Sequence, residues 1–122
     1  MAAVPHIAET SFGRITIDGW TYEHDVWILA DGEVKKRKKK LAKRVYGTSH
    51  RIGPEELAKL CQDPPDVLII GAGQSALAEL TDEGAEFLRE RGIEWQVLPT
   101  PQALAAYNRC PKRKAALIHV TC

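Results

Sequence analysis

Residues 67–76, VLIIGAGQSA, place four consecutive branched apolar side chains directly before Gly71, Gly73 and Ala76. An unbroken apolar run of this length is typical of a strand that is buried on both faces, as in a parallel sheet covered by helices. The two glycines and Ala76 also match the relaxed G-x-G-x-x-A form of a dinucleotide-binding fingerprint. The stretch therefore predicts an interior strand, and it raises the question of a cofactor site at the end of that strand.

The ribose-binding part of the fingerprint is missing. In cofactor-binding folds, an acidic residue about twenty positions further on holds the ribose hydroxyls. Here the next apolar segment, IEWQVL (93–98), runs into Pro99, and Glu94 lies at the wrong end of that segment. We therefore predict no cofactor, and we attribute Gly71 and Gly73 to a sharp turn after the buried strand.

The carboxyl end of this strand is still a candidate site for a small ligand. Ligands gather at the carboxyl edge of open α/β sheets, and exposed N–H groups of a glycine-rich turn can hold an anion. Thr100 follows the neighbouring strand, and His50 belongs to a Gly47-Thr48-x-His50 motif that also suits a turn before a helix. The candidate ligand-binding residues are Gly71, Gly73, Gln74, Ser75, Thr100 and His50.

The N-terminal part of the chain carries strand signals. The segments FGRITI (12–17) and WTYEHDVWIL (20–29) each lead to an Asp-Gly pair, which is typical of tight turns. They predict an antiparallel meander whose aromatic residues pack against a core. These aromatic residues are Trp20, Tyr22 and Trp27.

Three helix–strand pairs follow this meander. Helices are predicted from Pro54 with two acidic residues in the first turn, from Thr81 to Gly92, and from Thr100 through Tyr107. They alternate with the strands VLII (67–70), IEWQVL (93–98) and AALIHV (115–120). We therefore predict an α/β fold: a single layered domain over residues 1–122, with a mixed sheet, an N-terminal antiparallel meander and three α-β units with parallel strands.

The charge of the chain is unevenly distributed. The 122 residues carry a formal net charge of +1, but KKRKKKLAKR (35–44) holds eight of the 17 Lys and Arg and no acid. The rest of the chain has nine basic and 16 acidic side chains, a balance of −7. This run predicts a solvated loop or a protected sheet edge, with polyanion binding, nucleic acid included, as the alternative. The polyanion candidates are Lys35, Lys36, Arg37, Lys38, Lys39, Lys40, Lys43 and Arg44.

The cysteines and histidines raise two chemical alternatives. His119 and Cys122 close the chain as His-x-Thr-Cys, which could form a thiolate–imidazole nucleophile or, with His50, a zinc site. No paired ligand spacing points to a metal, so we predict none and favour simple packing for both residues. The odd number of cysteines predicts reduced thiols. Because the sequence shows neither a signal peptide nor a membrane span, we expect a cytoplasmic protein without a membrane partner.

Several motifs together resemble the Mth-type domain family, which includes small archaeal and bacterial proteins and a vertebrate adipogenesis-associated member. These motifs are GTSH (47–50) before PEEL (54–57), DVLIIGAG (66–73), a helix begun by Thr and containing Tyr107-Asn108, and IHVTC (118–122). A more distant branch resembles mitochondrial complex I assembly factors, in which the Cys-bearing ending is not expected. The resemblance implies a compact α/β domain with a mixed sheet, and it transfers no catalytic residues.

These observations favour a non-enzymatic binding or adaptor domain that acts through an unidentified protein partner or a small polar ligand. The first alternative is an enzyme or polar-ligand binder that uses the carboxyl edge of the parallel strands. The second is polyanion binding through residues 35–44. The sequence leaves open whether the protein is an enzyme.

Overall fold

The apolar segment before the two glycines is the interior strand that the sequence predicts. In the computed structural model, which describes residues 4–122, β7 (Val67–Ala72) runs parallel to β10 (Lys114–His119) on one side and to β9 (Glu94–Leu98) on the other. All six residues of β7 are buried. Its apolar side chains alternate between two separate hydrophobic cores, one on each face of the sheet.

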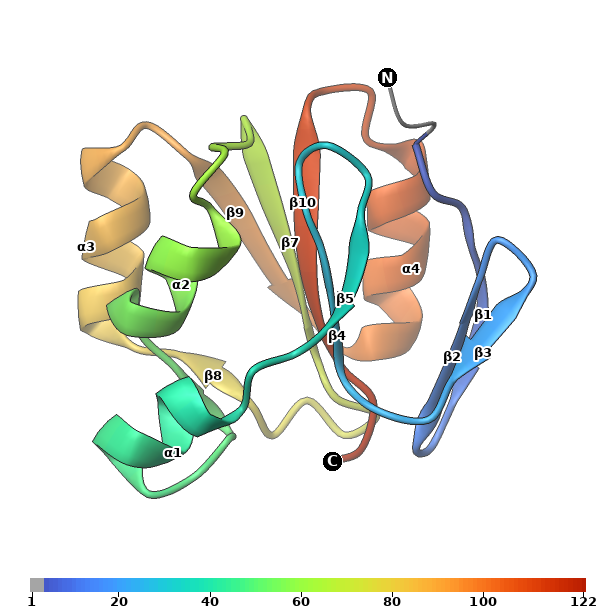
Figure 1. The fold of residues 1–122 in the computed structure, drawn as a ribbon, viewed down its shortest axis with the longest axis horizontal. Helices are drawn as coiled ribbons and strands as arrows, with labels where there is room; N and C mark the ends of the chain where they lie inside the picture. Colours follow the sequence, from blue (N-terminus) through green and yellow to red (C-terminus); the bar gives the residue numbers. More distant parts are fainter. Residues whose placement is uncertain (1–3) are drawn as a thin grey trace.

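The main sheet has the strand order β5-β4-β10-β7-β9 (Figure 1). The strands β4 (Val26–Ile28) and β5 (Val34–Lys36) join it in antiparallel pairing, so the last strand of the chain lies at its centre. The helices α2 (Pro54–Leu60) and α3 (Asp82–Glu90) cover one face, and α4 (Thr100–Arg109) covers the other. The predicted α/β fold with three parallel α-β units is therefore confirmed.

Two of the three predicted helix starts are confirmed. Pro54 occupies the first position of α2, and the Thr81 hydroxyl accepts a hydrogen bond from the Gly84 N–H at 3.0 Å at the start of α3. The third start differs by one residue, because Pro99 precedes α4 and Thr100 is already helical. The Thr100 hydroxyl makes no cap, and it is used at the carboxyl edge of the sheet instead.

The N-terminal meander forms a sheet of its own. β1 (Ile7–Ser11), β2 (Arg14–Ile17) and β3 (Trp20–Tyr22) pair antiparallel and lie beside α4 (Figure 1). The predicted segment 20–29 is thus split, because its second half leaves this sheet as β4 and enters the main sheet. The break includes Asp25, whose buried carboxylate has hydrogen-bond partners elsewhere in the fold.

Three short elements were not predicted. The helix α1 (Lys40–Tyr46) lies inside the basic run, buries Leu41 and Ala42, and ends at Gly47 with φ +73°. The strands β6 (Arg51–Ile52) and β8 (Glu79–Leu80) form a parallel pair. The basic run is therefore an edge strand, a short connection and a helix. The prediction of a sheet edge or a loop is confirmed for β5 and the connection, whereas the helix was not predicted.

The aromatic residues of the N-terminal part separate into two groups. Trp27 is 2% exposed and Tyr22 packs against a core, as predicted. Trp20 is 73% exposed, so the prediction that it packs was wrong. It follows the Asp18-Gly19 turn on the free edge strand β3, where no further element covers it.

The sequence predicts no membrane span. Across residues 4–122, no helix combines the length and the apolar character that a membrane crossing requires.

Candidate functional site

The two glycines of the fingerprint serve different purposes. A Cβ atom at Gly71 would lie 2.9 Å from the Thr100 Oγ1 and 3.4 Å from the Ala103 Cβ, so Gly71 allows α4 to pack closely on β7. Gly73 has φ +106°, and a Cβ there would lie 2.2 Å from the backbone carbon of Cys122. The predicted sharp turn is therefore confirmed at Gly73, whereas Gly71 provides a close helix–strand contact.

The C-terminal residues fill the carboxyl edge of the sheet. The Gly73 N–H donates to the Thr100 hydroxyl at 2.9 Å, and that hydroxyl donates to the carbonyl of His119 at 2.6 Å. The Gln74 N–H donates to the Thr121 carbonyl at 2.7 Å. Two of the N–H groups proposed for ligand binding thus already have partners within the fold, and Ser75 alone of the three residues 73–75 is exposed.

The segment after Gly73 also differs from a nucleotide-binding loop. Residues 74–81 form turns and β8, and the next helix begins only at Asp82. The Gln74 amide points towards the small sheet, where it donates to the Thr10 hydroxyl at 3.0 Å and the Ser11 carbonyl at 3.1 Å. The helix that follows the glycines in the chain therefore does not start at them, as it does where a pyrophosphate is bound. Gly73 lies instead at the start of α4, where its carbonyl accepts from the Thr100 N–H at 3.0 Å.

The candidate residues that the sequence left unconnected come together at this edge. The rings of His50 and His119 lie edge to face with 5.1 Å between their centroids. A Cβ at Gly73 would touch both the His119 ring, at 2.8 Å, and Cys122. His50 also makes the predicted turn, because its N–H donates to the Thr48 hydroxyl at 3.1 Å. The fold thus brings His50, His119, Cys122 and the glycine loop into one cluster.

A chain of hydrogen bonds runs through the buried imidazole of this cluster. The His119 Nδ1 lies 2.7 Å from the Asp25 Oδ2, and the Nε2 lies 3.2 Å from the Thr121 hydroxyl. His119 and Asp25 are each 1% exposed, whereas Thr121 is half-buried. The Thr121 hydroxyl, the His119 imidazole and the Asp25 carboxylate are thus connected in the same order as the hydroxyl, imidazole and carboxylate of a catalytic triad in acyl-transfer enzymes.

Asp25 also belongs to an ion-pair network built around Arg37. The Arg37 guanidinium donates to the Asp25 Oδ2 at 2.9 Å and to both oxygens of Glu56, at 2.7 and 3.0 Å. The Trp27 indole N–H donates to Glu56 at 3.0 Å, and the Ser49 carbonyl accepts from Arg37 at 2.8 Å. All three charged side chains are at most 1% exposed.

Two sequence interpretations are corrected by this network. Arg37 cannot take part in a surface patch for polyanions, because its side chain is fully buried. Glu56 lies in the first turn of α2 as predicted, but its carboxylate pairs with Arg37. One feature of the sequence indicated the buried pairing of Arg37: it is the single arginine among five lysines in residues 35–40. A guanidinium suits buried pairing with carboxylates better than an ammonium does.

The charges of the network stabilise one another. Burial by itself would raise the pKa of Asp25, but hydrogen bonds from His119, the Val120 N–H and Arg37 hold it well below its ordinary range. Burial by itself would lower the pKa of Arg37, and the carboxylates of Glu56 and Asp25 raise it. Both groups therefore stay ionised inside the protein.

The remaining basic residues do lie on the surface. Lys39 is half-buried, with its Nζ 3.7 Å from the Asp25 Oδ2. The exposed members of the run are Lys35, Lys36, Lys38, Lys40, Lys43 and Arg44. A cavity of about 310 Å³, which we call the basic groove, is lined by Lys35, Lys38 and Lys59 together with Trp27, Leu29, Leu60, Gln62 and the acids Asp31 and Asp63.

The histidines, cysteines and acids bear on the metal and thiol alternatives. Within residues 4–122, no group of three or more His, Cys, Asp or Glu side chains is placed to hold a metal ion. The three cysteines are free. Burial raises the pKa of the Cys61 thiol to about 12, so this thiol is not a nucleophile near neutral pH.

Known proteins share this arrangement over nearly the whole chain. The model of a family described as "Protein of unknown function (DUF498/DUF598)" matches residues 7–119. The chain belongs to the DUF498/DUF598 family. A conserved hypothetical protein from Pyrococcus horikoshii OT3 is 36% identical, with a TM-score of 0.89 over 95% of this chain and 98% of the other.

Two further solved structures are similar to this chain. The protein MT938 is 35% identical, with a TM-score of 0.83 over 97% of this chain and 99% of the other. An Mth938-like domain from Bordetella pertussis shares the fold at 18% identity, with a TM-score of 0.61 over 94% of this chain and 85% of the other. The resemblance to the Mth-type family is therefore confirmed. The DUF498/DUF598 description assigns no activity, substrate or partner.

Proposed function

We propose that this protein is a non-enzymatic binding domain that recognises an acidic segment of a partner protein in the basic groove. The observation that carries the proposal is the convergence of Lys35, Lys38 and Lys59, from β5, the following connection and α2, on one cavity of about 310 Å³. These side chains are exposed, and among residues 4–122 the one acid within salt-bridge distance of Lys35 is Glu33, with 4.0 Å between Nζ and Oε1.

The buried network supports this proposal because it fixes the basic segment from inside. Arg37, which lies between Lys36 and Lys38 in the chain, is paired with the buried Asp25 and Glu56. The backbone that carries the two lysines is therefore held against the core. A surface that is ordered before binding loses less conformational entropy when a partner binds. The lysines are thus presented by a rigid part of the fold.

The composition of the groove favours a peptide over nucleic acid. Its apolar floor includes Leu29 and Leu60, which can accept a hydrophobic side chain between two acidic ones. Asp31 and Asp63 stand at the same groove, and the chain outside 35–44 has a balance of −7. A long phosphate backbone would extend past the groove over this acidic remainder of the chain, whereas a short acidic segment contacts only the groove, where Asp63 is already paired with Arg113.

Charge reversal in the groove is expected to weaken this binding. With a fluorescent peptide of alternating glutamate and leucine, the double variant Lys38→Glu/Lys59→Glu should lose about tenfold in affinity or more, measured by anisotropy at low salt. The control Lys36→Glu/Lys43→Glu changes the net charge equally at exposed positions outside the groove. Its affinity should change by less than about threefold.

Other outcomes of this titration would contradict the proposal. Equal losses in the two double variants would show that only overall charge matters. Tighter binding of single-stranded or duplex DNA than of the peptide would favour the polyanion alternative. No saturable binding of the peptide would exclude the groove as an acidic-segment site.

A second candidate function is acyl transfer at the carboxyl edge, and the Thr121–His119–Asp25 chain favours it. Thr121 Oγ1 would attack the carbonyl carbon of an activated ester, and its proton would pass through the His119 Nε2 to the leaving alkoxide. Water would then release the acid by the reverse proton path. This candidate requires that the ester reach the half-buried Thr121 and that the leaving alkoxide lie against the Nε2 of the buried His119.

Ester hydrolysis tests this second candidate. Turnover of p-nitrophenyl acetate should fall about a hundredfold or more in Thr121→Val and be retained in Thr121→Ser, because only the valine lacks the hydroxyl. Thr21→Val, which removes an exposed hydroxyl on β3, is the control. The candidate would be excluded if the unaltered protein hydrolysed the ester no faster than Thr121→Val does.

A further inference from the structure

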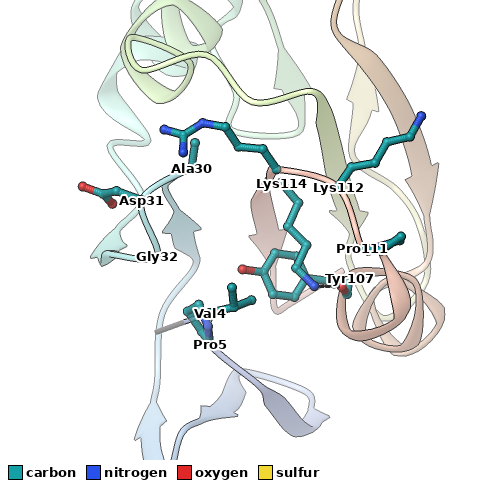
Figure 2. A pocket seen from close by; sticks show the side chains of 10 residues that line it. Val4, Pro5, Ala30, Asp31, Gly32, Tyr107, Pro111, Lys112 and Lys114 are labelled. Atoms are coloured by element: carbon teal, nitrogen blue, oxygen red, sulfur yellow. Dashed lines mark hydrogen bonds between the residues drawn. The ribbon is translucent and has the colours of Figure 1, made fainter. Parts of the chain in front are cut away.

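A second cavity lies at the opposite, amino end of the parallel strands. It has a volume of about 340 Å³ and opens between the N-terminal segment at Val4, the β4–β5 turn at Gly32 and the connection from α4 to β10 (Figure 2). Binding sites for small molecules begin at about 300 Å³. It shares only Asp31 with the basic groove, so it is a separate site.

Tyr107 presents an unpaired donor to this cavity. Its side chain belongs to the core and is 1% exposed, yet no residue between 4 and 122 hydrogen-bonds its hydroxyl. Figure 2 shows the hydroxyl directed towards the space bounded by Gly32 and Val4. Burial raises the pKa of Tyr107, so the hydroxyl stays protonated and can donate. No fully buried side-chain oxygen or nitrogen of residues 4–122 lacks a hydrogen-bond partner, so solvent in the cavity reaches this hydroxyl, and a ligand that accepts from it would replace that water.

Lys114 brings a positive charge to the same cavity. Its Nζ donates to the carbonyls of Tyr107 and Cys110, the latter at 3.0 Å, and lies 4.3 Å from the centroid of the Tyr107 ring. An ammonium has three N–H donors, so one remains. The burial that lowers the pKa of Lys114 is not offset by a carboxylate, since no acid of residues 4–122 lies within salt-bridge distance.

The other charged residues at the cavity already have partners. Lys112 pairs with Glu94 at 3.4 Å, and Arg113 pairs with Asp63 at 2.5 Å. The Asp31 Oδ1 accepts from the Glu33 N–H at 2.9 Å. One cation and one hydroxyl donor therefore remain for a ligand.

We propose that this cavity binds a small monocarboxylate. The carboxylate accepts from the Tyr107 hydroxyl and the Lys114 ammonium, and a short apolar body lies against Val4 and Pro5. A neutral ligand would leave the ammonium without a counter-charge. A phosphate dianion would bring more negative charge than the one unpaired cation can balance. A monoanion with an apolar part fits both the charge and the lining.

Titration with three probes tests the proposal: benzoate, its uncharged isostere benzamide, and inorganic phosphate. In ¹H–¹⁵N spectra, benzoate should give saturable shifts at residues 30–32 and 112–114, with an affinity at least about tenfold higher than that of benzamide or phosphate. Tyr107→Phe should weaken benzoate binding about tenfold and leave the melting temperature unchanged, because no residue between 4 and 122 hydrogen-bonds its hydroxyl. Tyr22→Phe, outside the cavity, is the matched control.

Several results would overturn the proposal. These are no saturable shift with benzoate, equal affinity for benzoate and benzamide, shifts that map to another surface, or undiminished binding to Tyr107→Phe. Because this variant removes only a hydroxyl that no residue between 4 and 122 bonds, an unchanged melting temperature would show that a loss of binding is not caused by unfolding. Lys114→Met adds a second check, since a folded variant should no longer prefer benzoate to benzamide.

Discussion

An Arg37→Met variant is expected to lose about 3–5 kcal/mol of unfolding free energy, which is the usual cost of breaking a buried ion pair from one side. Arg37 is the cation between Asp25 and Glu56, and all three side chains are at most 1% exposed. Methionine fills a similar volume, but it leaves two buried carboxylates close together. Their repulsion and lost hydrogen bonds, rather than a cavity, cause the expected loss.

Urea unfolding of the variant and of Lys36→Met measures this effect. Lys36 is exposed and adjacent, so its substitution removes the same charge without touching the network, and we expect a change within about 0.5 kcal/mol. The triple change Arg37→Met/Asp25→Asn/Glu56→Gln should recover part of the loss, because no buried charge then lacks a partner. Equal midpoints for Arg37→Met and Lys36→Met would contradict the buried network.

A Gly73→Ala variant is expected to lose about 3–5 kcal/mol through a different mechanism. At φ +106° an alanine is strained by about 1–3 kcal/mol. Its Cβ would also lie 2.2 Å from the backbone carbon of Cys122, so the C-terminal residues must move. That movement breaks the hydrogen bonds from the Gln74 and Leu77 N–H groups to Thr121 and Cys122, each worth about 1 kcal/mol.

Gly13→Ala separates the two contributions to this loss. Gly13 has φ +83°, and a Cβ there would meet no atom within 4 Å. Only the backbone strain remains, for which we expect about 1–2 kcal/mol. Thermal unfolding of both variants measures the difference. If Gly73→Ala were no less stable than Gly13→Ala, the C-terminal residues would not be packed against the glycine loop.

Local patterns were sufficient for most of the secondary structure. The apolar run 67–70 predicted an interior parallel strand, and Pro54 and Thr81 marked the starts of two helices, because strand burial and helix capping act within a few residues. The short helix α1 was missed because three of its seven residues, Lys40, Lys43 and Arg44, continue the basic run, and only Leu41 and Ala42 are buried. Burial of so few side chains leaves a weak periodic signal.

The candidate site depended on distant parts of the chain. The glycine loop and the residues His50, His119 and Cys122 were named from the sequence, but only the fold shows that they meet. The same fold removes Arg37 from the surface and places it between two carboxylates that the sequence did not connect. The sequence did not indicate that the Tyr107 hydroxyl lies at a cavity either. A tyrosine on the apolar face of a helix is normally assigned to the core.

The sequence by itself determined the α/β class, the parallel units, the turn at Gly73 and the family, because these follow from short motifs and local periodicity. The tertiary structure alone decided which polar groups are buried together. Asp25 and His119 are 94 residues apart in the chain and 2.7 Å apart in space. Such pairs form where strands from distant parts of the chain meet in one sheet. Their interaction is strong because both groups are buried away from water, and no local pattern of residues indicates which groups will be buried together.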